Sequence, residues 1–157
     1  MRKRIINPAE LQSQPLEEDG LNIEALAEVD ITSEHPDHPI EFALLPGQAL
    51  GWQAAESGRQ IIRLRFSIPQ LLERIWLRFE ETRVERTQEY ALHWSSDGGK
   101  SYQEIVRQQW NFSPDGATLQ EEDHHVSLEG VTVLELSIIP EINGGDTVAS
   151  LSQMRLF

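Results

Sequence analysis

Two stretches near the middle of the chain alternate apolar and polar residues with the period of two that a half-buried β-strand requires. In Gln60–Phe66 the apolar side chains are Ile62, Leu64 and Phe66, and arginines stand between them. In Ile75–Phe79 every second residue is again large and apolar. Because successive side chains of a strand point to opposite faces, each stretch is predicted to turn one face to a core and the other to solvent.

The same alternation recurs toward the C-terminus. Tyr90–Trp94 and Leu134–Ile138 each carry three alternating apolar side chains, and Ala149–Phe157 is apolar enough for a terminal strand that docks onto the domain. Weaker strand candidates are Val29–Ser33, Ile40–Leu44, Gln103–Gln108 and His125–Leu128. Short strands separated by Pro and Gly predict an all-β protein, a single antiparallel β-sandwich of the jelly-roll type with about eight strands.

Helical signal is confined to two short segments. Asn22–Glu28 predicts about two helical turns, and Pro69–Leu72 about one, with proline at the first helical position, where it is tolerated. Residues 1–28 lack strong periodicity, so we expect an N-terminal arm packed on a β-sandwich domain of residues 29–157. Trp76 shares its strand face with charged residues, and this arm is the expected cover for its ring.

Composition narrows the function classes. The 157 residues include 26 acidic and 13 basic ones, which gives a formal net charge of -13. Such a charge repels phosphate backbones and anionic lipids, so we expect neither a nucleic-acid nor a membrane partner. The absence of Cys excludes disulfides, thiol catalysis and cysteine zinc sites. No apolar run approaches the roughly 18 residues of a membrane span, and none forms a signal-peptide core. We therefore expect a cytoplasmic protein, or one that has lost an export signal.

Ser95–Tyr102 carries the pattern Ser-x-Asp-x-Gly-x-Ser-aromatic, which resembles the Asp-box hairpin of sialidase propellers and many extracellular β modules. Asp97 can accept hydrogen bonds from backbone amides, and Gly98 and Gly99 supply the positive φ of a tight turn. We interpret the segment as a structural turn between two strands. It does not continue a phosphate-binding loop, because Trp94 stands where that motif needs glycine.

Two clusters hold metal-capable side chains. Glu34–His38 and Glu121–His125 combine imidazoles with carboxylates, which bind zinc, or calcium through the carboxylates alone. Their spacings match no recognised site, so we interpret both as polar loops, expect no cofactor and leave a structural calcium ion open. No nucleophile elbow, metalloprotease motif or dinucleotide motif is present in the sequence. A small hydrolase that uses Asp123 with His124 or His125 is the enzymatic alternative.

Aromatic residues also occupy predicted connections between strands. Trp52 lies in a predicted loop of residues 45–58, and Trp110 lies in a predicted loop of residues 107–115. A large ring on a loop either closes the open end of the sandwich or offers a flat face to a ligand such as a sugar. Both possibilities stay open from the sequence.

The second of these loops has the composition of a binding site. Arg107 and Asn111 flank Trp110, and a flat apolar ring beside amide and guanidinium groups suits a sugar or a polar peptide. Arg83 lies on another inter-strand segment, and the loops of a jelly roll gather at its two ends. The candidate ligand-binding residues are therefore Trp52, Arg83, Arg107, Trp110 and Asn111, and no catalytic residue is assigned.

The order of these segments resembles a known family. Gly51–Gly58 leads into the strand Gln60–Phe66, the strand Ile75–Phe79 follows, and the chain closes on Ala149–Phe157. Over residues 29–157 this order resembles the discoidin family, also called coagulation factor 5/8 type C, of the galactose-binding-like jelly rolls. The resemblance implies a non-catalytic module that binds glycans, lipids or proteins through loops at one end of the barrel, often with a structural calcium ion. It also points to the loops around Trp52, Arg83 and Trp110.

Secreted discoidin domains commonly tie their termini with a disulfide, which a chain without Cys lacks, so the resemblance implies an intracellular or bacterial version. We expect a binding module rather than an enzyme, with carbohydrate as its ligand. The alternative is an intracellular protein–protein interaction domain. A glycan array separates these two functions.

Overall fold

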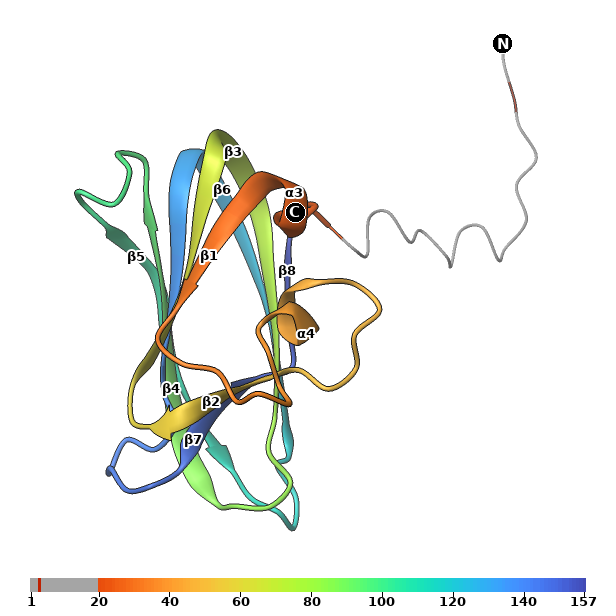
Figure 1. Ribbon diagram of the computed structural model, residues 1–157, viewed down its shortest axis with the longest axis vertical. Coiled ribbons are helices and arrows are strands. Elements are labelled where there is room, and N and C mark those ends of the chain that lie inside the picture. The colour runs from red at the N-terminus through yellow and green to blue at the C-terminus, as the bar shows by residue number, and fades with distance from the viewer. Residues whose placement is uncertain (1–2, 4–19) are drawn as a thin grey trace.

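The computed structural model describes Lys3 and residues 20–157 (Figure 1). The elements in this part of the chain are α3 (Ile23–Leu26), β1 (Ala27–Ile31), α4 (Glu41–Leu44), β2 (Trp52–Ser57), β3 (Gln60–Glu80), β4 (Arg86–Ser95), β5 (Gln103–Phe112), β6 (Leu119–Ile139), β7 (Val148–Leu151) and β8 (Gln153–Leu156). Each pairing between these strands is antiparallel. The prediction of an all-β antiparallel fold is confirmed.

Two strands of 21 residues each, β3 and β6, form the frame of the sandwich. Residues 60–65 of β3 pair with residues 133–138 of β6, and residues 75–80 pair with residues 119–124. The register shifts between these halves, and Figure 1 shows both strands curving over at one end of the molecule. Bulges bend a strand in this way. The strand order β1-β3-β6-β4-β5 uses the first half of β3, and β8 pairs with its second half.

The two halves of this frame pack face to face around the core. Phe79 in the second half of β3 contacts Tyr90 of β4, with ring centroids 5.2 Å apart. The Tyr90 hydroxyl lies 2.7 Å from Nε2 of His124 in β6. Period-two alternation identified the core correctly, because the predicted inward residues of β3 are all buried: Ile62, Leu64, Phe66, Ile75, Leu77 and Phe79.

The turn that joins β4 to β5 is the one predicted over residues 95–102. The Asp97 carboxylate accepts hydrogen bonds from Ser95 Oγ (2.6 Å), from Ser101 N (2.9 Å) and from Ser101 Oγ (2.6 Å). Gly98 and Gly99 have φ of 75° and 91°. Hydrogen bonds from Ser101 and Ser95 hold the pKa of Asp97 far below its usual range. The structural interpretation of this segment is confirmed.

Two predictions near the N-terminus are wrong in type or extent. Ile40–Leu44 forms the helical turn α4 rather than a strand, because Pro39 opens a turn whose last two residues pack into the core. The helix predicted over Asn22–Glu28 ends at Leu26, since the next residues pair with β3 as β1. That pairing supplies more hydrogen bonds than a second helical turn would.

Three segments predicted as helix or loop are strands. Pro69–Leu72 belongs to β3 and lies among its register shifts, where a missing N–H breaks no ladder hydrogen bond. The predicted loop of residues 45–58 contains β2, which pairs with β7. The predicted loop of residues 107–115 is strand as far as Phe112, because β5 pairs with β4 along its length. Polar glutamines hide the apolar alternation of β5 from the sequence, although the segment pairs with β4.

The acidic cluster Glu121–His125 is also strand rather than loop, and forms part of the first half of β6. Its carboxylates lie beside the arginines of β3. Arg74 Nε is 2.7 Å from Asp123 Oδ1, and Arg78 Nε is 3.8 Å from Glu121 Oε1. These opposite charges on neighbouring strands allow an acidic run to pair in a sheet.

Most of the predicted N-terminal arm, residues 1–2 and 4–19, lies outside the described residues, and so does its predicted packing over Trp76. The last part of the arm is described. Leu21 N donates to Leu156 O (2.7 Å), and Ile23 is buried in the core. No helix within the described range is long and apolar enough to cross a membrane.

Candidate functional site

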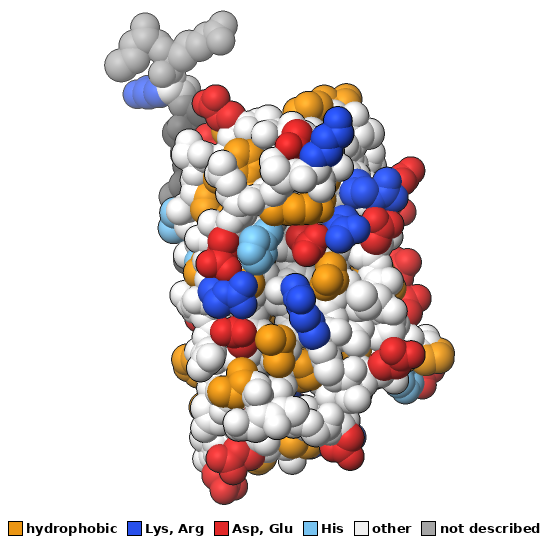
Figure 2. Space-filling view, turned by 90° about the vertical axis from the view of Figure 1, so that its left-hand side faces the viewer, with side chains coloured by type: hydrophobic (Ala, Val, Ile, Leu, Met, Phe, Trp, Pro, Cys, Tyr) orange, Lys and Arg blue, Asp and Glu red, His pale blue; other side chains and the backbone are white. Residues whose placement is uncertain are grey.

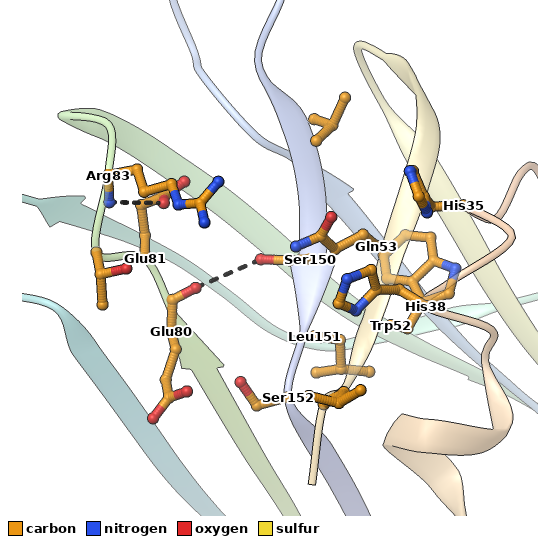
Figure 3. Close-up of a pocket in the computed structure, with 13 residues that line it drawn as sticks. His35, His38, Trp52, Gln53, Glu80, Glu81, Arg83, Ser150, Leu151 and Ser152 are labelled. Carbon is orange, nitrogen blue, oxygen red and sulfur yellow. Dashed lines mark hydrogen bonds between the residues drawn. The ribbon is translucent and has the colours of Figure 1, made fainter.

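A cleft of about 490 Å³ opens between the β2–β7 ribbon and the connection that follows β3 (Figure 3). Its volume lies within the range of about 300–1,000 Å³ that is typical of small-ligand sites. The cleft is lined by His35, His38, Leu50, Trp52, Gln53, Glu80, Glu81, Thr82, Arg83, Val148, Ser150, Leu151 and Ser152.

The histidines of the cleft stand on a short loop that is fastened to β2. His35 N donates to Gln53 O (2.8 Å), and Gln53 N donates to His38 O (3.2 Å). The Asp37 amide donates to His35 Nδ1 (3.1 Å), which orients that ring. The two imidazole rings meet edge to face, with centroids 5.6 Å apart. Nδ1 of His38 is buried and has no hydrogen-bond partner among the described residues, so it keeps an unused hydrogen-bonding position.

Trp52 forms the floor of the cleft rather than a stacking surface. Only 1% of the residue is exposed, and its Nε1 donates to Ser33 O (3.1 Å). Gly51 precedes it with φ of 71°, and a Cβ at this position would stand 2.8 Å from Leu151 O. Glycine is therefore required for β2 to approach β7 this closely. The ring packs into the core and presents no open face to a ligand.

The wall opposite the histidines carries two carboxylates, and both are paired. Glu81 Oε1 accepts from Arg86 Nε (2.8 Å), and Glu81 Oε2 accepts from Arg83 N (3.2 Å). Glu80 Oε1 accepts from Arg78 (3.1 Å). The negative charge of this wall is thus offset by two guanidinium groups.

Arg83 extends from the same wall toward the space between the two sides of the cleft (Figure 3). Its guanidinium has no hydrogen bond or ion pair with the residues that the structure describes. Leu50 and Val148 also line the cleft and are 67% and 37% exposed. The cleft therefore combines free polar groups with an exposed aliphatic edge.

The remaining predicted site residues lie on β5, outside the lining of this cleft. Arg107 and Asn111 are exposed on one face of the strand, where Arg107 pairs with Glu104 (2.8 Å) and Asn111 accepts from Thr87 Oγ1 (3.0 Å). Trp110 points to the opposite face, because neighbouring strand residues alternate. It is half-buried, and its buried Nε1 has no partner in the described part of the chain.

Arg107 also lines a separate hollow of about 140 Å³, together with Arg59 and Glu89. Figure 2 shows the side of the molecule on which β5 lies, where basic side chains stand next to acidic ones. The structure thus brings Trp52 and Arg83 to one cleft and leaves Arg107, Trp110 and Asn111 on β5. The predicted five-residue group does not converge.

The two metal-capable clusters do not gather a ligand set. Within the described residues, no group of three His, Asp or Glu side chains lies close enough to hold a metal ion. His35 and His38 meet in the cleft without a third such ligand. The structural calcium ion that the family resemblance implied stays a prediction.

Strand geometry separates His124 from the other two residues of the alternative hydrolase group. His124 faces inward to Tyr90, and burial lowers its pKa below the usual value. Asp123 faces outward, where the hydrogen bond from Arg74 lowers its pKa. His125 shares that outer face, and its side chain is 77% exposed. Asp123 and His124 are therefore on opposite faces, whereas His125 Nε2 lies 3.6 Å from Asp123 Oδ2 on the exposed outer face.

The sequence did not identify His35, His38 or Gln53 as ligand-contacting candidates. The histidines were grouped with acidic neighbours as a metal-capable cluster, and Gln53 lay in a predicted loop. One signal was available: each histidine of His35-Pro36-Asp37-His38-Pro39 is followed by a proline, and prolines stiffen a loop that holds two imidazoles.

Solved structures with the same fold were found by comparison. CpGH89CBM32-5 from Clostridium perfringens, in complex with GalNAc-β-1,3-galactose, has 21% identity and a TM-score of 0.61 over 83% of this chain and 94% of that chain. CBM32-3 from a family 31 glycoside hydrolase of the same organism has 16% identity and a TM-score of 0.66, over 90% and 96%. CBM32 of AlyQ, in complex with 4,5-unsaturated mannuronic acid, has 15% identity and a TM-score of 0.61, over 84% and 95%. No family model and no curated protein matches the chain.

These structures are CBM32 carbohydrate-binding modules of the discoidin-like, galactose-binding-like jelly-roll superfamily. At these identities the similarity establishes the fold. The jelly-roll sandwich that the discoidin resemblance implied is therefore confirmed.

Proposed function

We propose that this protein is a non-catalytic carbohydrate-binding module whose ligand lies in the cleft above Trp52. The observation that carries the proposal is a set of polar side chains that line one cleft: the Arg83 guanidinium and the Gln53 amide, which have no partner in the described range, and the imidazoles of His35 and His38. A sugar ring offers several hydroxyl groups that satisfy such donors and acceptors at once, and its apolar edges suit Leu50 and Val148.

The structural comparison supports this ligand class. Two of the modules with this fold were solved with bound sugars, one with GalNAc-β-1,3-galactose and one with 4,5-unsaturated mannuronic acid. The same sandwich therefore accommodates neutral and acidic sugars in other proteins.

The carboxylates of the cleft favour binding over hydrolysis. A glycosidase needs two carboxyl groups that face each other across the scissile bond, one of them free to donate a proton. Glu80 and Glu81 lie on one wall, and each is engaged by an arginine. This arrangement supports a module that binds a sugar without cleaving it.

A glycan array of the full chain tests the proposal, with the cleft and β5 compared by substitution. We expect Gln53→Ala and His38→Ala each to weaken binding by about three- to tenfold, the contribution of one hydrogen bond. The matched control is Asn111→Ala, an exposed polar residue of β5, which should bind like the wild type.

Binding that is lost in Asn111→Ala and unchanged in Gln53→Ala would move the site to β5. An array without signal, together with capture of a protein from the native cytosol, would favour the protein-interaction alternative over a carbohydrate ligand.

A further inference from the structure

The cleft contains one guanidinium that is not paired with a carboxylate of the described residues. Each of its two carboxylates is matched by an arginine, Glu80 by Arg78 at 3.1 Å and Glu81 by Arg86 at 2.8 Å. Arg83 also lines the cleft and has no such partner among the described residues. Arg83 is therefore the cationic group of the cleft that is left to pair with a ligand, in a protein with net charge -13.

From this imbalance we propose that the cleft selects an acidic sugar, a hexuronic acid residue whose carboxylate is bound by Arg83. The inference rests on the proposed function and names the substrate class of the same site. The guanidinium is planar and presents parallel N–H donors that match the two oxygens of a carboxylate. A neutral hexose has a single hydroxyl at that position and leaves the charge unpaired.

The geometry of the cleft suits this assignment. Arg83 reaches in from one wall, and His35 and His38 stand on the opposite wall (Figure 3). A pyranose ring that lies between the walls presents its carboxylate to Arg83 and its hydroxyl groups to the imidazoles. Val148 and Leu50 contact the apolar edge of the ring.

The acidic surface elsewhere does not cancel the attraction. Exposed charges more than about 8 Å apart are largely screened at physiological ionic strength, whereas a directly bound carboxylate is not. The net negative charge therefore slows the approach of an anion more than it weakens a contact already made.

Titration calorimetry of the full chain with matched methyl glycosides tests the inference. Each uronic acid is compared with its parent hexose in the galacto, gluco and manno series, and a hexose 6-sulfate is the second anionic probe. We expect the preferred uronide to bind about tenfold more tightly than its hexose, which corresponds to about 1.4 kcal/mol. Arg83→Gln should abolish this preference, so that uronide and hexose bind with affinities within about twofold of each other. Arg59→Gln, with the same charge change at an arginine that lines the separate hollow, should leave the ratio of uronide to hexose affinity as it is in the wild type.

Each contrary outcome has a distinct meaning. Equal binding of hexose and uronide, or a uronide preference that survives Arg83→Gln, overturns the acidic-sugar inference and leaves the carbohydrate-binding function in place. Tighter binding of the 6-sulfate than of the uronide overturns the assignment of a carboxylate. Absence of binding to every glycoside, with no signal on the array, overturns both proposals. Unchanged thermal unfolding of the variants confirms that they are folded.

Discussion

Arg86 shows how one buried guanidinium organises both walls of the cleft. Its side chain is fully buried and donates to Glu81 Oε1 (2.8 Å), to Pro140 O (3.0 Å) and to Ser150 Oγ (3.3 Å). The same group lies over the Phe112 ring at 4.9 Å. Glu81 follows β3, Pro140 follows β6 and Ser150 lies in β7. Arg86 therefore fixes the ends of three strands relative to one another.

Arg86→Met is expected to destabilise the protein by about 3–5 kcal/mol, because it leaves the Glu81 carboxylate and a carbonyl without their partner in a buried place. Denaturant unfolding of the variant and the wild type measures this loss. Arg65→Met is the matched control, since Arg65 pairs with Glu28 and Asp30 at the exposed surface and should matter much less. Equal losses in the two variants would contradict the role given to Arg86.

At the scale of the strands, periodicity predicted the core but not the site. The inward faces of β3 could be read from alternating residues, because the core needs only that apolar side chains share a face. The cleft depends instead on which loops and strand ends lie side by side in the folded protein. His38 and Gln53 come together through the backbone hydrogen bonds of one loop on β2, and Arg83 reaches them from the far end of β3. No local pattern encodes that meeting.

Strand geometry also explains why the site predicted on β5 is divided. A loop would let Trp110 and Asn111 face one ligand together, and the sequence predicted such a loop. In a strand, adjacent residues point to opposite faces, so the indole lies inward while the amide lies outward. The prediction was wrong because the glutamines of β5 interrupt the apolar–polar alternation by which a strand is recognised in a sequence.

The contact between Tyr90 and His124 joins the two layers and makes stability depend on pH. Burial lowers the pKa of His124 below its ordinary value of 6.5, and Glu122 and Asp123 oppose this shift more weakly. The unfolded chain therefore binds the proton more readily than the folded protein does. The contribution of neutral His124 is fully present above about pH 6.5 and declines as pH falls toward the folded pKa.

His124→Gln should therefore flatten the loss of stability between about pH 7 and pH 5, the interval in which an unperturbed histidine titrates. The free energy of unfolding, measured by denaturant titration at several pH values, checks this. His125→Gln is the control for removal of a neighbouring imidazole, because the side chain of His125 is 77% exposed. A profile that stays as steep in His124→Gln as in the wild type would contradict the assignment.

At the scale of the whole molecule, several acidic residues are held by ion pairs with arginines. Arg63 pairs with Glu135 at 3.0 Å, Arg65 with Asp30 at 2.8 Å, and Arg74 with Asp123 at 2.7 Å. Figure 2 shows this mixture of signs over the side of the molecule it presents. The acidic excess that remains is spread over the surface, where it favours solubility and repels polyanions.

Calcium is therefore expected to leave the stability of the protein almost unchanged. No three carboxylate or imidazole groups within residues 20–157 lie close enough to form a site, so added cations only screen repulsion. If a calcium site exists, a calcium concentration of about 100 times its dissociation constant would raise the free energy of unfolding by about 2.7 kcal/mol. This increase would shift the melting temperature by several degrees. Thermal unfolding in chelator, in millimolar magnesium and in millimolar calcium distinguishes the two cases. Equal melting temperatures in both cations support the prediction, whereas a rise in calcium that magnesium does not reproduce would show a specific site.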